Sequence, residues 1–321
     1  MRDRLAHWLH QVQACRYHRR TTESLNQLIQ MLYAESHLNI PYVVLIIASC
    51  AIATFGLLSN SAAVIIGAMV IAPLMLPIRG LALAALIGEF KMFWQAAFAL
   101  IVGTLVAIGM SWTIGVMVGL EVYGSEIMAR SQPNLLDLGI AVAAGAVSAY
   151  AIAEPRVSST LAGTEIAVAL MPPICTIGLG IAQLNARLSI GATLLYLTNL
   201  LGIALACMVV FVIVGYIPLQ KGQRPLAIAA ALTGLLVIPL AISFSRLIEQ
   251  TRLQHQVRQA LTRGTLTFQR LDLLSMETSW VTDPPVVRLN VRAREPVTPK
   301  QVALMEQFIE RQMRRPFRLV L

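Results

Sequence analysis

Residues 59–88 read SNSAAVIIGAMVIAPLMLPIRGLALAALIG, a nearly uncharged apolar run. A bilayer core about 30 Å thick needs about 20 apolar residues per helix, so this run is too long for one straight span. Pro73 and Pro77 interrupt it, and Arg79 follows them. A proline lacks the backbone donor and disrupts the helical hydrogen-bond ladder. The stretch therefore predicts a membrane span that is broken in its middle.

The composition of the whole chain also indicates a membrane protein. Of 321 residues, 57% are hydrophobic and 13% are charged, whereas an average soluble domain is about 25% charged. Most of the charged residues lie in residues 1–38 and 246–321, and the net charge is +9. This composition argues against a soluble enzyme, a disordered regulator and a disulfide scaffold. We expect a membrane domain with a basic segment at each end.

The apolar runs predict an α-helical polytopic membrane protein with seven spans. The predicted spans are Pro41–Leu58, Ala62–Gly88, Met92–Leu120, Leu138–Ala153, Leu161–Ala182, Leu188–Ile217 and Leu226–Ile248. Pro172 and Pro173 interrupt the fifth of them, as Pro73 and Pro77 interrupt the second.

An internal repeat joins these two interrupted spans at an offset of 99 residues. The matches are Ser59 with Ser158, Ser61 with Thr160, Ala63 with Ala162, Ala68 with Ala167, and Pro73 with Pro172. Three spans per repeat is an odd number, so the second copy must enter the membrane from the opposite side. Transporters built from such inverted repeats bind their substrate at broken helices near the midplane. The alternative is that the prolines only kink packed helices.

Charged residues inside spans cost roughly 2.5–3.5 kcal/mol each on insertion scales and are functional candidates. Arg79 lies after Pro73, and Glu165 lies before Pro172, so inverted repeats would place both at similar depth. We hypothesise that they form an ion pair or a gate, the alternative being that each snorkels separately to the headgroups. Asn199 could line a polar path or bond to a neighbouring helix.

These features favour a channel or transporter for a small solute or ion. The alternative is a membrane sensor or scaffold that anchors and oligomerises the C-terminal module. We expect no enzymatic activity, no cofactor and no metal, because no motif of catalytic or metal-binding spacing occurs. The expected pathway residues are Asn60, Ser61, Pro73, Pro77, Arg79, Thr160, Glu165, Pro172, Pro173 and Asn199.

The expected domain organisation follows the spans. Residues 1–38 form a basic amphipathic helical segment, 39–120 the first repeat, 121–134 a polar loop, 135–217 the second repeat, 226–248 the seventh span, and 249–321 a small α/β module. In this module Val287, Leu289 and Val291 alternate with polar residues as in a half-buried strand. Thr298-Pro299-Lys300-Gln301 has the pattern of a helix start.

The distribution of lysine and arginine over the short loops places the N-terminus in the cytoplasm and the protein in the inner (plasma) membrane. The side of the C-terminal module stays open, because long domains cross largely regardless of their charge. Anionic headgroups are the expected partners of the basic ends. We expect a homo-oligomer and no nucleic-acid partner.

Three motifs carry a resemblance to a known family: Asn60 to Met75, Ala129-Arg130-Ser-Gln-Pro133-Asn134, and Ile166 to Pro173. Over about residues 40–217 the chain resembles a bacterial and archaeal family of uncharacterised membrane proteins, named only for a conserved hydrophobic domain of unknown function. The C-terminal module is similar to those attached in many members, and loosely to small BON-like modules. The resemblance implies a polytopic membrane protein without assigning a substrate.

Overall fold

The chain is organised as two compact units, residues 1–243 and 244–321. The structure is a computed structural model. It describes residues 22–119, 123–153, 170–218, 222–241, 245, 252, 271–279, 286–293, 299–313, 316 and 318–320.

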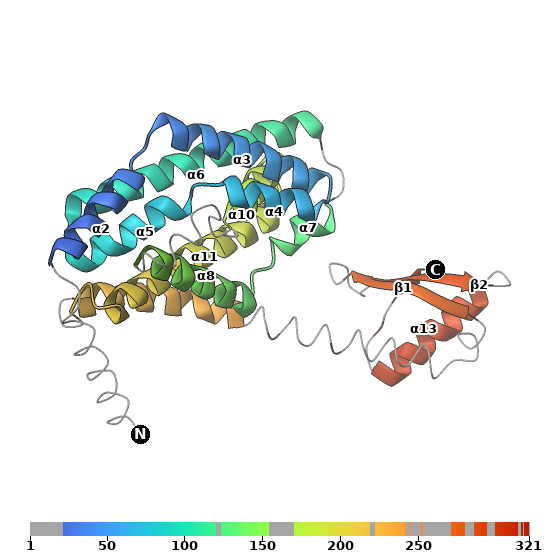
Figure 1. Cartoon of the computed structure of the whole chain (residues 1–321). Coiled ribbons are helices and arrows are strands. Elements are labelled where there is room, and N and C mark those ends of the chain that lie inside the picture. Colours follow the sequence, from blue (N-terminus) through green and yellow to red (C-terminus); the bar gives the residue numbers. More distant parts are fainter. Residues whose placement is uncertain are drawn as a thin grey trace, which may run out of the picture. The chain divides into compact units, whose positions relative to one another are not determined.

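The first unit is helical (Figure 1). Its helices are α2 (Thr22–Glu35), α3 (Ile40–Leu58), α4 (Ala62–Ile71), α5 (Met75–Ile87), α6 (Phe90–Val118), α7 (Ser125–Ala129), α8 (Leu135–Ala153), α10 (Met171–Ala182), α11 (Ala186–Ile213) and the helix Gly222–Ala241. In the described residues five helices are long and apolar enough to cross a membrane, and α4 and α5, bent by 51° relative to each other, meet the same criterion when taken together as one broken helix. The chain is thus an α-helical, multi-pass membrane protein.

The predicted spans agree in part with these helices. The second span is broken, as expected, and the break covers residues 72–74 between α4 and α5. The expected count was seven spans. The remaining one, Leu161–Ala182, is described only from Leu170 onward, where α10 supplies 12 residues.

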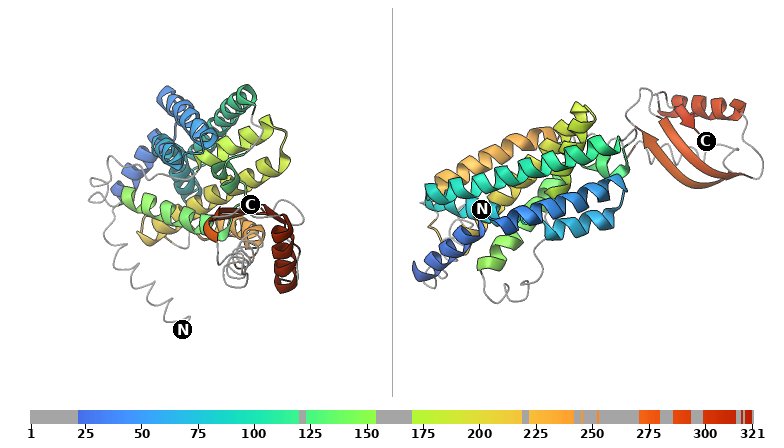
Figure 2. Two further views of the ribbon diagram at one scale, coloured as in Figure 1. Left: turned by 90° about the vertical axis from the view of Figure 1, so that its right-hand side faces the viewer. Right: turned by 90° about the horizontal axis from the view of Figure 1, so that it is seen from above.

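The axes of the long helices are roughly aligned, as those of α3, α6 and the helix Gly222–Ala241 are in Figure 1 and in the right-hand view of Figure 2. They can be traced between two ends of the unit. At the α7 end, Asn60 Oδ1 accepts a hydrogen bond from Glu126 N at 2.9 Å, and Gln183 Nε2 donates to Gly115 O at 3.4 Å. The backbone of Ser131 contacts Gly191 at this same end. Helices α3, α6 and α10 therefore finish at the α7 end, and α8 and α11 begin there.

The other helix termini lie at the opposite end of the unit, the α2 end. Gln95 Nε2, near the start of α6, donates to Tyr33 O at 3.0 Å. Tyr216 Oη, just after α11, donates to Ala153 O at the end of α8 at 3.4 Å. Helix α5 finishes at the α2 end as well, since Leu86 contacts Gly222 at the start of the helix Gly222–Ala241.

Helix α6 illustrates how the sequence divides protein contacts from lipid contacts. Gly103, Ala107, Ser111 and Gly115 recur every four residues and are all buried. Such small residues let helix backbones approach closely, and in this protein they pack against α3 and α10 within the same chain. Large apolar side chains such as Leu105, 62% exposed, occupy the other face, which suits contact with lipid.

A second stripe of small residues does the same for α8. Ala141, Gly145, Ala149 and Ala153 are buried, and α8 packs along α11. A Cβ atom on Gly145 would lie 2.7 Å from the backbone oxygen of Ile203, so the two helices touch through their main chains. Both small-residue stripes therefore serve packing inside one chain.

Helix α2 is part of this packing rather than a free surface helix. Leu28 and Leu32, on its apolar stripe, are buried, and α2 packs against α5. The predicted amphipathic character of the N-terminal segment is therefore used, at least over Thr22–Glu35, to cover a half-helix of the membrane unit. The basic residues before it lie outside the described residues.

The second unit contains strands β1 (Leu271–Ser279), β2 (Val286–Ala293) and β3 (Arg318–Val320) and helix α13 (Pro299–Met313). The sheet order is β1-β2-β3, with β1 antiparallel and β3 parallel to β2. Met305 and Ile309 of α13 are buried, as are Val287 and Leu289 of β2. Helix α13 begins at Pro299, where the sequence predicted a helix start.

Candidate functional site

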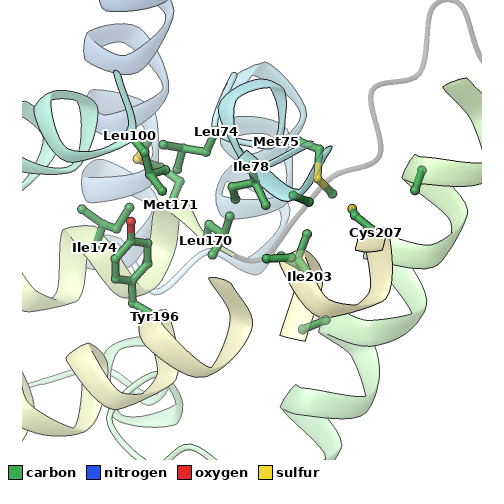
Figure 3. Packing of buried hydrophobic residues seen from close by; sticks show 14 of the residues in the cluster. Leu74, Met75, Ile78, Leu100, Leu170, Met171, Ile174, Tyr196, Ile203 and Cys207 are labelled. Atoms are coloured by element: carbon green, nitrogen blue, oxygen red, sulfur yellow. The ribbon is translucent and has the colours of Figure 1, made fainter. Parts of the chain in front are cut away.

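The two half-helices α5 and α10 both begin inside the protein. Leu74, just before α5, and Leu170, just before α10, are at most 2% exposed and belong to one buried apolar cluster. Figure 3 shows this cluster with side chains from the starts of both half-helices and from α11. From these starts α5 runs to the α2 end and α10 runs to the α7 end.

Prolines make these internal helix starts possible. The first four N–H groups of a helix have no partner within it, and an unsatisfied donor costs several kcal/mol in a dry core. Pro77 is the third residue of α5, and Pro172 and Pro173 are the second and third residues of α10. A proline has no N–H, so each one removes a donor that the apolar surroundings could not satisfy.

The structure places the second proline pair at a helix start. The sequence pattern predicted that Pro172 and Pro173 interrupt a span, and in the structure they lie in the first turn of α10. The preceding residues 154–169, which include the predicted site residues Thr160 and Glu165, lie outside the described residues. Pro73 occupies the break before α5 and is buried, so the backbone there faces protein rather than lipid, as expected.

The two half-helices have similar sequences at an offset of 96 residues. Leu74-Met75-Leu76-Pro77-Ile78 corresponds to Leu170-Met171-Pro172-Pro173-Ile174. The two stretches occupy the same place in their helices, because α5 begins at Met75 and α10 at Met171. The offset of 99 residues instead pairs Pro73 with Pro172, which lie on different sides of a helix start. The repeated Leu-Met-x-Pro-Ile pattern was the signal that sequence reasoning missed.

The turns that follow the two half-helices repeat the same backbone geometry at this offset. Gly88 and Leu184 both have a positive φ, of 75° and 53°. The next residues, Glu89 and Asn185, have φ/ψ of −84°/91° and −92°/90°. Gly119 and Gly215, which follow the long helices α6 and α11 and are also 96 residues apart, have a positive φ as well.

Arg79 is the charged side chain of the described half-helices, and its contacts reach two other helices. Its Nη2 lies 3.3 Å from Glu35 Oε2 of α2, and its Nη1 donates to Ser148 Oγ of α8 at 3.5 Å. The Arg79 side chain is 15% exposed and that of Glu35 is 33% exposed. The repeat in the sequence favoured Glu165 as the partner, which lies outside the described residues; among the described residues the carboxylate at Arg79 is that of Glu35.

Asn199 is buried deep in α11 and is 4% exposed. Helical spacing places it on the same face as Tyr196 and Ile203, which contribute to the apolar cluster of Figure 3. The Tyr196 hydroxyl lies 2.8 Å from Thr104 Oγ1 of α6. Polar groups of α11 are thus turned toward protein neighbours.

Asn60 and Ser61 lie far from the half-helix starts. Asn60 Oδ1 accepts hydrogen bonds from Glu126 N at 2.9 Å and from Ser125 Oγ at 3.1 Å. Asn60 also has a φ of 53°, a conformation that asparagine tolerates better than most residues. Its role in the structure is to cap α7. Ser61 precedes α4 and makes no side-chain capping bond.

Replacing Asn60 by alanine is expected to lower the free energy of unfolding by about 1–2 kcal/mol. The change removes a cap and places alanine, which tolerates the left-handed region less well than asparagine, at a positive φ. Asn60→Gly should cost less, because glycine keeps that conformation. The midpoint of thermal unfolding in detergent measures both, with Ser61→Ala as the neighbouring control that should match wild type. Equal midpoints for Asn60→Ala and wild type would contradict this role.

Among the described residues, no group of three His, Cys, Asp or Glu side chains is arranged to hold a metal ion.

Comparison with known proteins agrees with the family that the motifs suggested. Residues 69–205 match a family described as "Domain of unknown function (DUF389)". An uncharacterised protein of Methanocaldococcus jannaschii is 27% identical over 182 residues, and this match covers 57% of each chain. The chain thus spans a little over half the length of this relative. No solved structure matches the present chain. Residues 69–205, which include both half-helices, are therefore similar to this uncharacterised family.

Proposed function

We propose that the membrane unit is a channel or transporter for a small solute or ion, built from two three-helix units of opposite orientation. The observation that carries this proposal is the pair of half-helices that begin in the buried core and run to opposite ends. Discontinuous helices of this kind, placed at corresponding positions of two repeats, form the substrate and ion sites of known secondary transporters.

The lengths and directions of the helices support the inverted arrangement. Helices α3 and α8 have 19 residues each, α5 and α10 have 13 and 12, and α6 and α11 have 29 and 28. Helices α3 and α6 finish at the α7 end, where α8 and α11 begin. Helix α5 runs to the α2 end, whereas α10 runs to the α7 end. The 96-residue match in sequence and backbone geometry adds to this support.

The site of the proposed pathway is best placed near Arg79. The guanidinium is mostly buried, and the neighbouring Ser148 is 2% exposed. A cation held in a membrane protein is a functional candidate, and an arginine recognises anions through several donors at once. The N-terminal ends of α5 and α10 carry partial positive charge. An anion is therefore the favoured substrate. The carboxylate of Glu35 would pair with Arg79 when no anion is bound.

One observation favours the alternative, a membrane sensor or scaffold. The described side chains at the starts of the half-helices are apolar and closely packed (Figure 3), whereas an open pathway needs polar lining. In a transporter the same packing corresponds to a closed state. Flux distinguishes the two functions, because a scaffold carries none.

Purified protein in liposomes is expected to conduct small anions faster than protein-free liposomes do, in assays against a panel of small anions and cations. Arg79→Lys should lower the anion flux at least about tenfold, because lysine keeps the charge but cannot hold two partners in a planar fork. Asn60→Gly, which lies at the α7 end, is the matched control and should conduct like wild type. Protein that is folded but gives no flux of any ion would support the scaffold.

Basic residues near the α2 end favour a cytoplasmic position for that end. Lys91 and Arg224 lie at or near it, and five arginines precede α2 in the sequence. The positive-inside rule then favours an inner membrane protein with its N-terminus in the cytoplasm. Anionic headgroups would contact the basic segments. The protein would act as a homo-oligomer, without enzymatic activity and without binding nucleic acid.

A further inference from the structure

Two buried thiols face each other across α3 and α10. Cys50 Sγ and Cys175 Sγ are 3.5 Å apart, and both residues are 0% exposed. Cys50 Sγ also donates to Ala107 O of α6 at 3.2 Å. The two cysteines are separated by 125 residues, so nothing in the sequence pairs them, and each reads as a small buried apolar residue.

We infer that Cys50 and Cys175 form a reversible disulfide. A disulfide requires about 2.05 Å between the sulfurs, so they must approach by about 1.5 Å. Rotation of both side chains, with a small shift of α3 relative to α10, can supply this movement. Cys207 is buried as well, but its Sγ donates to the backbone oxygen of Gly145 at 3.4 Å.

The reaction needs an acceptor that can enter an apolar core. The two thiols lose two electrons and two protons as the S–S bond forms. A lipid-soluble quinone accepts both and becomes the quinol. Reduction by a dithiol returns the two thiols through a mixed disulfide. Because both sulfurs are surrounded by protein, water-soluble oxidants that do not cross the bilayer should react slowly.

The bond would tie α3 of the first three-helix unit to α10 of the second three-helix unit. Helix α10 is buried along residues 171–180 and contacts α3, α6 and α11, so a covalent link at Cys175 would hold it against the first three-helix unit. If the three-helix units move against each other during transport, the oxidised protein should be locked. This consequence rests on the proposed function, whereas formation of the bond does not.

The full-length protein in liposomes tests the inference, with Cys15 replaced by serine because it lies outside the described residues. The sample is treated with a membrane-soluble quinone, unfolded in denaturant, and its free thiols are counted with a maleimide polymer that shifts the band on a gel. Three free thiols are expected before oxidation and one after it, with recovery of three on reduction. Mass spectrometry should find a peptide from α3 linked to one from α10.

Three variants show which thiols react. Cys50→Ser and Cys175→Ser should each keep two free thiols after oxidation, and Cys207→Ser, the matched buried control, should lose both of its thiols. Cys50→Ala is used in parallel should the serine variant unfold, as judged by thermal melting. Three free thiols in oxidised, folded protein, or loss of thiols in the Cys50 variants, would overturn the inference.

Flux is measured on the same samples as a separate readout. Oxidation should lower the flux at least about tenfold in protein that retains Cys50 and Cys175, and reduction should restore it. A disulfide that forms without any change in flux would contradict the locking effect while leaving the bond itself established. Absence of flux before oxidation would count against the proposed function alone.

Discussion

Gly178→Leu is expected to abolish folded, monodisperse protein. A Cβ atom at Gly178 of α10 would collide with Ser111 Oγ, and it would lie 2.6 Å from the backbone oxygen of Ile108. A backbone atom cannot turn aside as a side chain can, so α10 would have to move away from α6. Overpacking in a close-packed core costs about 1–3 kcal/mol for modest insertions and more for a branched side chain. Size-exclusion chromatography of detergent extracts measures the loss.

Gly109 of α6 provides the matched control for this prediction. It also lies in the interior of a helix, but nothing approaches within 4 Å of the position of its added Cβ. Gly109→Leu should give a normal yield, and the thermal midpoint should stay the same or rise, because leucine favours helix more than glycine does by somewhat under 1 kcal/mol. Similar losses for both leucine variants would show that the contact of α10 with α6 is not the cause.

Arg79→Glu is expected to lower the thermal stability severely, and Glu35→Arg on the same chain should restore much of it. Removing one partner of a fully buried ion pair costs about 3–5 kcal/mol, because the other charge remains without compensation, and the partly exposed Glu35 side chain lowers this cost. In this variant a second carboxylate would face Glu35 in place of the guanidinium, whose Nη2 now lies 3.3 Å from Glu35 Oε2. The measurement is the midpoint of thermal unfolding of the single and double variants in detergent.

The competing pairing gives a separate outcome in the same experiment. The sequence hypothesis predicts rescue of Arg79→Glu by Glu165→Arg, whereas the ion pair in the structure predicts rescue by Glu35→Arg. Recovery with Glu165→Arg alone would show that Glu35 is not the partner that stabilises Arg79. Recovery with neither substitution would show that Arg79 acts through Ser148 or the backbone around it.

The membrane unit combines close packing with a buried charge. The stripes of small residues on α6 and α8 hold the helices together through close backbone contact. The half-helices α5 and α10 begin within the buried apolar cluster, and Arg79 of α5 is the charge held near it. A transport function requires that this packing can open, whereas a scaffold function does not depend on opening, so flux measurements on well-folded protein decide between them.

The spans could be read from the sequence because lipid imposes a simple rule on it. A helix that crosses a bilayer needs an apolar length of about 20 residues, and the predicted limits of the first and third spans lie within two residues of α3 and α6. The break in the second span followed from its excess length and from Pro73 and Pro77. The small-residue stripes were visible for the same reason, because their period is that of the helix.

Contacts between distant residues could not be read in this way. The partner of Arg79 lies on a helix that the sequence indicated only as a basic amphipathic segment, and nothing local distinguishes Glu35 from Glu165. The role of Asn60 as the cap of α7 and the meeting of Cys50 with Cys175 depend equally on how the helices are arranged.

Hydropathy along the amino-acid sequence is therefore enough to predict that this chain crosses a membrane several times, where most of its spans lie, and that one of them is broken. The folded arrangement is needed to learn which helix ends share a side, that the carboxylate of Glu35 meets Arg79, and that Pro172 and Pro173 lie at a helix start inside the core. The physical reason is that transfer into lipid acts on each residue separately, whereas ion pairs, caps and thiol contacts require two groups that the chain brings together only when it folds.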